Sequence, residues 1–442
     1  MVMKIFLITI FVFLFSNCSF DNKTGIWNNS NEIIEKKADS FKNFKKLYTE
    51  NKLFDQIILP NNDFKISLDP IKINLKWPDE FYQKSNNLEN FSYKNLNKQI
   101  FKSKKLSKYK IKEKILFDGE NLLISDIRGN IFVYSTKFQK TIFKYNFYKK
   151  KFKGLTKDLY IIVEGNIIYV ADNLGYTYAI NHVNQKILWA KNFKIPFRSN
   201  IKIFKNNIIL ADTSNSIYFI DKLTGNIFKT LPTEEVTLKN EFINSLAIDE
   251  NSLFYLNTFG SLYSISSIGK INWFLNISQY SEVDASNSFG SNPITLYKNK
   301  VIVSADKFLY VFNSIDGSRI VKSPITSIVK PLISNENIFM ITKNNLLVNI
   351  NLSTGNINYS LDISSEIANF LDTKKKTIYI KTLSILDNNL YIFLDNSFYV
   401  KFSPGGKILS VEKLPAKLGS YPIFINDSIL YINEKNRFVI VN

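Results

Sequence analysis

Residues that could carry out chemistry are scarce in this chain of 442 residues. His182 is its only histidine and Cys18 its only cysteine, and Cys18 lies in the N-terminal leader. The chain therefore offers no Ser-His-Asp or Cys-His arrangement, no metal site built from these residues and no disulfide beyond the leader. It also has no Gly-x-x-x-x-Gly-Lys loop for a phosphate. We expect no catalytic residue, no metal and no cofactor, and we expect His182 to be a solvated turn residue.

Aspartates recur at one turn of a repeated pattern. They are Asp172, Asp212, Asp306 and Asp395. Carboxylates bind calcium, but equivalent turns of a ring-shaped repeat lie far apart. An aspartate also accepts hydrogen bonds from backbone N–H groups just after it, which closes turns. We therefore interpret these aspartates as turn-capping residues.

The turns belong to a unit of short apolar strands. In residues 207–228, apolar runs at 208–211 and 217–220 are separated by polar turns, as in a β-meander. The middle strand of the unit begins again at intervals of about 40 to 50 residues, which is typical of a β-propeller. Its eight starts are Ile131, Thr177, Ile217, Leu262, Leu309, Leu347, Phe398 and Phe438. The pattern predicts an all-β fold, an eight-bladed β-propeller of four-stranded antiparallel blades.

Glycine and tryptophan mark two further positions of the repeat. Glycine suits a turn residue with positive φ. It follows the middle strand at Gly225, Gly269, Gly317, Gly355 and Gly406. The first two repeats have Gln139 and Gln185 instead, so we expect their turns to close differently. Trp189 and Trp273 occupy equivalent outer strands, which indicates packing between blades and not a platform for a ligand.

The two ends of the repeat pattern complement each other. The last repeat reaches Asn442 soon after Phe438, without an outer strand. Residues 99–102 (Gln-Ile-Phe-Lys) resemble the outer strand at residues 186–189. We predict that a strand within residues 98–106 completes the last blade, which removes two open sheet edges and closes the ring.

The N-terminus has the features of an export signal. Lys4 precedes an apolar run at residues 5–15, which is too short for a spanning helix. Residues 14–18 (Leu-Phe-Ser-Asn-Cys) resemble a bacterial lipobox, although Asn17 departs from the usual Gly or Ala. The resemblance implies that Cys18 is lipidated, and Ser19 after it is similar to lipoproteins sorted to the outer membrane. The expected location is the periplasmic face of a Gram-negative outer membrane, held by the lipid anchor.

Three regions are expected along the chain. Residues 1–18 are a lipoprotein signal peptide. Residues 19–96 are a tether with a short amphipathic helix within residues 31–48. At residues 51–97 we expect an irregular segment on the propeller surface, because prolines interrupt any strand or helix there. Residues 97–442 are the propeller.

The formal net charge of +19 has two interpretations. It indicates an anionic partner such as nucleic acid or a membrane surface, or it reflects a composition rich in Lys, Asn, Ile and Phe. The lysines are scattered apart from residues 98–114, which favours the second interpretation. We expect no nucleic-acid partner.

Residues 170–175 (Val-Ala-Asp-Asn-Leu-Gly), followed by Trp189, resemble the quinoprotein-type (PQQ-like) propeller repeat. Together with the lipobox-like leader and Trp77-Pro78 ahead of the closing strand, the chain resembles the BamB-type family of outer-membrane β-barrel assembly lipoproteins. The resemblance implies a non-catalytic scaffold, a monomer within a larger complex, that binds the periplasmic part of a BamA-like barrel-forming subunit.

Two loops carry the local resemblance. Residues 195–198 resemble the Leu-x-Leu-Arg stretch through which this family contacts the barrel-forming subunit, with Ile195 and Phe197 in place of the leucines and Arg198 kept. Glu282 and Asp284 resemble the acidic Asp-x-Asp loop that supports it. An exposed apolar pair beside an arginine suits an interface anchor. In the alternative interpretation, Ile195 and Phe197 begin the next inner strand and Arg198 caps it.

Two other functions stay open at this point. One is a periplasmic PQQ-dependent oxidoreductase, which would need a tryptophan under the cofactor and carboxylate ligands to calcium. The other is an envelope polysaccharide-binding propeller attracted by the basic charge.

Overall fold

The computed structural model describes residues 18–20, 27–29, 54–61, 65–148, 152, 154–235, 242–278, 289–305 and 307–442. The chain divides into two units, Met1–Lys52 and Leu53–Asn442. In the first unit, β1 (Cys18–Phe20) pairs antiparallel with β2 (Trp27–Asn29). The signal peptide before Cys18 and the helix expected within residues 31–48 lie outside the described residues and stay predictions.

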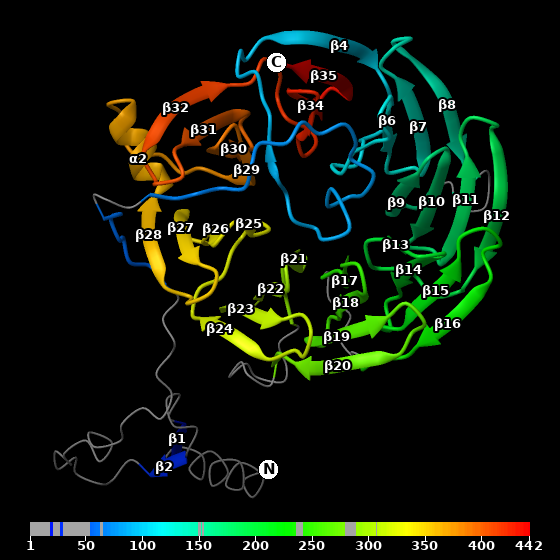
Figure 1. The fold of residues 1–442 in the computed structure, drawn as a ribbon, viewed down its shortest axis with the longest axis horizontal. Coiled ribbons are helices and arrows are strands. Elements are labelled where there is room, and N and C mark those ends of the chain that lie inside the picture. Colours follow the sequence, from blue (N-terminus) through cyan, green and yellow to red (C-terminus); the bar gives the residue numbers. More distant parts are fainter. Residues whose placement is uncertain are drawn as a thin grey trace, which may run out of the picture. The chain divides into compact units, whose positions relative to one another are not determined.

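The second unit is a ring of eight blades (Figure 1), as the repeat pattern predicts. Each blade is an antiparallel sheet of four chain segments, ordered from the centre of the ring to its rim. Blades 1 to 4 consist of β5 (Leu116–Phe117), β6 (Asn121–Ser125), β7 (Asn130–Ser135), β8 (Lys140–Asn146); β9 (Leu159–Glu164), β10 (Ile167–Asp172), β11 (Tyr176–Asn181), β12 (Lys186–Asn192); β13 (Lys202–Phe204), β14 (Asn207–Ala211), β15 (Ile217–Asp221), β16 (Ile227–Leu231); and β17 (Ser245–Ile248), β18 (Ser252–Leu256), β19 (Ser261–Ser266), β20 (Ile271–Asn276).

Blades 5 to 8 follow the same order, with one helix and two strands from earlier in the chain. A parallel strand, β3 (Asn90–Phe91), joins the inner edge of blade 7, and α2 (Ile363–Phe370) follows blade 6. These blades consist of β21 (Thr295–Tyr297), β22 (Lys300–Ala305), β23 (Phe308–Asn313), β24 (Arg319–Ser323); β25 (Leu332–Ser334), β26 (Asn337–Ile341), β27 (Leu346–Asn351), β28 (Ile357–Asp362); β29 (Ile380–Leu386), β30 (Asn389–Leu394), β31 (Phe398–Phe402), β32 (Ile408–Lys413); and β33 (Ile423–Ile425), β34 (Ser428–Ile432), β35 (Arg437–Val441), β4 (Gln99–Lys105). In the described part of the chain, no helix has both the length and the apolar character needed to cross a bilayer.

The core lies between neighbouring blades. The second and third strands are apolar on both faces, and in β15 Ile217, Tyr218, Phe219 and Ile220 are all buried. A strand buried on both faces needs a layer on each side of it, and the adjacent blades supply these layers.

The predicted closure of the ring is confirmed. β4 pairs antiparallel with β35, with Lys102 opposite Val439 and Phe101 opposite Ile440. The pairing continues past the strand, because Lys98 and Asn442 exchange two backbone hydrogen bonds of 3.1 Å. The N-terminal strand thus supplies the outer strand of blade 8.

The tryptophans pack between blades, as predicted. Trp189 in blade 2 donates its indole N–H to Lys222 O in blade 3 at 3.0 Å, and a Cβ added to Gly225 would lie 2.5 Å from the Trp189 ring. Trp273 in blade 4 makes the same contacts with blade 5, where its ring packs against Gly317. Glycine is therefore required at position 225 for two reasons. It leaves room for the Trp189 ring, and it adopts a φ of +71°.

We expect Gly225→Ala to lower the free energy of unfolding by about 2–3 kcal/mol, because it adds a steric clash to the cost of a left-handed alanine. Gly165→Ala is the matched control, since Gly165 also has a positive φ (+56°) but nothing within 4 Å of an added Cβ. The control should lose only about 1–2 kcal/mol. Denaturant unfolding of both variants measures the difference, and equal losses would contradict the packing role.

The turns at Gln139 and Gln185 close in the same conformation as the turns that contain glycine. Gln139 and Gln185 adopt φ of 52° and 56°, in the same left-handed region as the glycines. The expectation from sequence was wrong, because the turn imposes its conformation on a residue that has a side chain.

Candidate functional site

The loop of residues 193–199 joins blade 2 to blade 3 and contains three of the predicted interface residues. Its backbone is held from both sides. Phe197 N donates to Asp172 O in blade 2 at 3.0 Å, and Pro196 O accepts from Thr213 N in blade 3 at 2.9 Å. The backbone of Ile195 lies so close to Gly175 that a Cβ there would be 2.8 Å from Ile195 O. The loop is thus positioned before any partner binds.

The side chains of this loop that are accessible in the structure differ from those expected from the sequence. Phe197 is 1% exposed, and its ring centroid lies 5.1 Å from that of Phe193 and 5.9 Å from that of Tyr218. Phe197 therefore anchors the loop in the core, whereas Ile195 is half-buried. The alternative interpretation holds in part, because Phe197 forms an antiparallel bridge with Asp212 just beyond the end of β14, although β13 itself starts only at Lys202.

Arg198 lies where blades 3 and 4 meet. Its Nη2 donates to Thr258 Oγ1 at 3.2 Å, and this hydroxyl donates to Asn215 Oδ1 at 2.9 Å. Burial lowers the pKa of the guanidinium, while Tyr160, Tyr255 and Asp212 oppose this effect. Arginine remains charged at any physiological pH, so the loop presents a half-buried cation. Glu282 and Asp284 lie outside the described residues.

The recurring aspartates cap turns where the structure describes them in blades 2 and 3. Asp172 Oδ1 accepts from the backbone N–H groups of Leu174 and Tyr176, each at 2.8 Å. Asp212 accepts equivalent bonds from Ser214 and Ser216, which confirms the interpretation. Asp306 lies outside the described residues, and beside Asp395 the capping bond goes to Asn396 Oδ1, from Phe398 N. Within the described ranges, no group of three or more His, Cys, Asp or Glu is placed to hold a metal.

His182 is not the solvated residue expected from sequence. It is 4% exposed, because its turn packs against the Asp118 turn of blade 1, with Nε2 3.7 Å from Asp118 Oδ2. Burial lowers the pKa of the imidazole, and Asp118 partly opposes this.

Residues 74–91, which we call the plug, cross the centre of the ring (Figure 1). Asn74 Nδ2 donates to Phe424 O in blade 8 at 2.7 Å. Trp77 exchanges backbone hydrogen bonds of 2.7 and 2.8 Å with Phe117 in blade 1, and Pro78 O accepts from Val163 N in blade 2 at 2.9 Å. The plug thus begins by tying the last blade to the first two.

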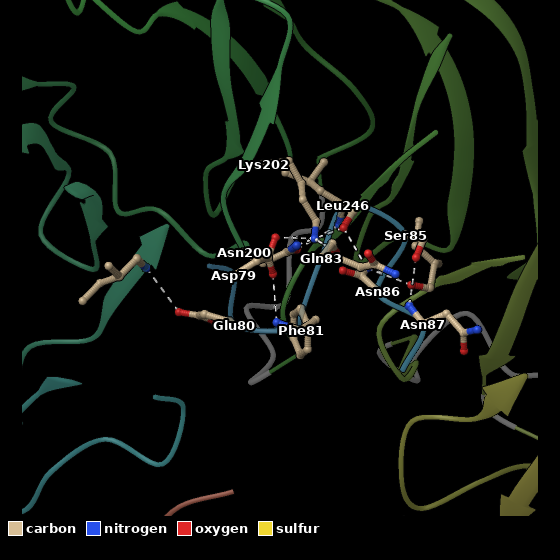
Figure 2. Close-up of polar contacts among 12 residues, drawn as sticks. Asp79, Glu80, Phe81, Gln83, Ser85, Asn86, Asn87, Asn200, Lys202 and Leu246 are labelled. Carbon is tan, nitrogen blue, oxygen red and sulfur yellow. Dashed lines mark hydrogen bonds and ion pairs between the residues drawn. The ribbon is translucent and has the colours of Figure 1, made fainter. Parts of the chain in front are cut away.

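An ion pair connects the plug to blade 3. Lys202 Nζ lies 2.5 Å from Asp79 Oδ2 and donates to Gln83 O at 2.8 Å (Figure 2). Asp79 Oδ1 also accepts from Phe81 N at 2.8 Å. Asp79 is 3% exposed and Lys202 0% exposed, so two opposite charges satisfy each other out of water.

Two asparagines connect the plug to blades 4, 5 and 6. Asn86 Nδ2 donates to Leu246 O at 2.9 Å and to Ile294 O at 2.8 Å, and Asn87 exchanges two hydrogen bonds with the backbone of Ile333. Figure 2 shows the contact between Asn86 and Leu246, with Asn87 next to it along the plug. Asn86 has a φ of 62°, a conformation that asparagine adopts more readily than most residues. With β3 paired to β29 in blade 7, the plug contacts every blade of the ring.

The plug corrects one expectation. Residues 51–97 were expected on the surface, and Leu59 and Leu96 are indeed exposed, yet within the plug Asn86 is fully buried and Phe91 is 1% exposed. The backbone is irregular, as expected, but several of its polar groups pair with the blades, among them Lys84 O with Ile248 N in blade 4 and Ser85 O with Leu296 N in blade 5. The sequence signal that could have located it is the density of aromatic residues between Trp77 and Tyr93 in a stretch without strand or helix periodicity.

Residues 116–361, more than half of the chain, match the family model described as outer membrane protein assembly factor BamB. The fold is similar to BamB from Moraxella catarrhalis, with 13% identity and a TM-score of 0.60 over 78% of this chain and 99% of that chain. It is also similar to quinohemoprotein alcohol dehydrogenase from Comamonas testosteroni, with 10% identity and a TM-score of 0.58 over 83% and 80% of the two chains. No curated protein sequence matches this chain. At these identities the two structures establish a likeness of fold alone.

Proposed function

The chain belongs to the family of outer membrane protein assembly factor BamB, and from this premise we propose that it is a non-catalytic adaptor in the assembly of outer-membrane β-barrel proteins. In this proposal it binds the periplasmic part of a BamA-like barrel-forming subunit. A lipid on Cys18 anchors it to the periplasmic face of the outer membrane. The family match over residues 116–361 is the observation that carries the proposal.

The interface in this proposal is the loop of residues 193–199. Its backbone is fixed by blades 2 and 3, and it carries the half-buried apolar side chain of Ile195 beside the cation of Arg198. An ordered loop loses little conformational entropy on binding, and arginine is enriched among the residues that dominate interfaces.

The outer strands at the rim of the ring offer a mechanism by which such an adaptor would assist the assembly of barrel proteins. Outer strands of neighbouring blades carry exposed apolar side chains, among them Leu188 in β12, Phe228 in β16 and Phe274 in β20. An outer strand has one edge without a neighbouring strand in its own sheet. An unfolded barrel segment would add to such an edge by backbone hydrogen bonding and place its apolar side chains against these residues.

We expect Arg198→Ala to reduce co-purification of the barrel-forming subunit about tenfold or more, since truncating an interface arginine often costs over 1.4 kcal/mol. Lys194→Ala is the matched control, because Lys194 is an exposed cation in the same loop. Affinity purification from envelopes measures binding, and thermal unfolding of each variant tests whether the contact with Thr258 matters for folding. Equal recovery of the subunit with both variants, at unchanged stability, would remove Arg198 from the interface.

A further inference from the structure

A cavity of ≈ 270 Å³ lies at the centre of the ring, beside the plug. Trp77, Phe81 and Leu88 of the plug form one side of it. The other side comes from six blades, through β29 and the segments that lead into the inner strands of blades 1, 4, 5, 6 and 8. A cavity at which so many blades converge is a common place for a small ligand.

The cavity combines apolar walls with positive charge. Ile328 and Tyr421 are partly exposed at its edge, so it is reached from solvent. Three lysines line it, Lys114, Lys330 and Lys381, against one carboxylate, Glu80. Glu80 is already 2.9 Å from Lys114 Nζ, and Lys381 is paired with Glu113 at 3.1 Å.

Of these three lysines, Lys330 is the one that forms no ion pair with a described carboxylate. Its Nζ donates to the backbone carbonyls of Asn86 and Phe81, and among the described residues no carboxylate lies within 4.0 Å of it. Burial, with repulsion from Lys202, lowers its pKa to about 7, while Asp79 opposes this. A bound anion would favour the charged amine.

Ser384 supplies a second, independent observation. It lies on β29, lines the cavity and is 1% exposed, and its hydroxyl has no hydrogen-bond partner in the described part of the chain. A buried hydroxyl without a partner costs free energy, so such groups in folded proteins call for an explanation. For a ligand oxygen in the cavity to satisfy it, the Ser384 side chain has to turn toward the cavity, because its oxygen is buried in the free protein.

We propose that this cavity binds an organic carboxylate with a small apolar body, held by charge pairing with Lys330, a hydrogen bond from Ser384 and contact with Phe81 and Leu88. A cavity of ≈ 270 Å³ is close to the lower end of the range for small-molecule sites. The proposal is independent of the adaptor function.

Phenylacetate is the probe, and phenylacetamide is its neutral counterpart of nearly the same shape. Titration calorimetry of the full chain should show binding of phenylacetate at pH 6 and about tenfold weaker binding at pH 8, because the protonated fraction of Lys330 falls across that range. Glu80, Glu113, Asp79, Lys114, Lys202, Lys381 and Tyr421 also face this region. Comparing Lys330→Met with a control lysine variant therefore tests whether the pH dependence of binding comes from Lys330.

Lys330→Met should weaken phenylacetate binding at least tenfold and remove the dependence on pH, whereas Lys374→Met, at an exposed lysine away from the cavity, should change neither. Ser384→Ala should weaken binding about tenfold without lowering the melting temperature, since its hydroxyl makes no bond in the free protein. This second variant keeps the test decisive if Lys330→Met disturbs the plug. Absence of binding in the millimolar range, equal binding of the amide, or undiminished binding to Ser384→Ala would each overturn the proposal.

Discussion

Replacing Asp79 by alanine is expected to lower the free energy of unfolding by about 3–5 kcal/mol, the usual cost of removing one partner of a buried ion pair. The ammonium of Lys202, fully buried in β13, would keep only the Gln83 carbonyl at 2.8 Å. Phe81 N would also lose its acceptor. Because these groups join the plug to blade 3, the loss should appear in the global unfolding transition measured by denaturant.

Glu434→Ala is the matched control for Asp79→Ala. The Lys417–Glu434 pair has nearly the same separation, 2.6 Å, but its side chains are 57% and 50% exposed. Solvent screens such a pair, so this variant should lose less than about 1 kcal/mol. If the two variants lose equal stability, the buried pair does not hold the plug.

The double variant Asp79→Leu/Lys202→Met refines the test. Removing both charges leaves no buried ion unpaired, so most of the loss caused by Asp79→Ala should be recovered. A double variant as unstable as Asp79→Ala would mean that the shape of the pair, and not its charge, holds the plug in place.

Features that repeat along the chain could be predicted from the sequence. The eight blades follow from strands recurring at a regular spacing, and the closing strand follows from a final repeat without an outer strand. Asp172 and Trp189 were placed correctly because each acts on residues of its own turn or of the next blade. Such short-range contacts leave a pattern that one sequence can show.

The plug and the cavity beside it could not be predicted in this way. Asn86 bonds residues 160 and 208 positions away, and Asp79 pairs with a lysine 123 positions away. An irregular backbone has no periodicity that marks which side chains are buried. Phe197 and His182 were misjudged for a related reason, because burial at a turn depends on which neighbouring blade packs over it.

Replacing residues 99–105 of β4 with a Gly/Ser linker of equal length is expected to lower the free energy of unfolding by about 5 kcal/mol or more, at about 1 kcal/mol per lost hydrogen bond. Phe101 adds to this loss. Its ring centroid lies 5.9 Å from Phe438 in blade 8 and 6.3 Å from Tyr134 in blade 1, so the strand ties the last blade to the first. The melting temperature should fall by about 6 °C or more.

Replacing β16 with a Gly/Ser linker of equal length is the control. It separates the effect of losing the ring-closing strand from the effect of losing any outer strand. β16 is as exposed as β4 and pairs only with β15, and blade 3 stays joined to its neighbours through the chain on both sides. Losing β16 removes similar hydrogen bonds but leaves the ring closed, so its melting temperature should fall less, with one cooperative transition. Losing β4 removes the strand that joins blades 8 and 1 and leaves the plug as a tie between them. Unfolding should therefore begin at this junction, and hydrogen exchange should show blade 8 losing protection first. Equal losses of stability and equal exchange in the two variants would mean that packing between blades, without β4, is enough to keep the ring shut.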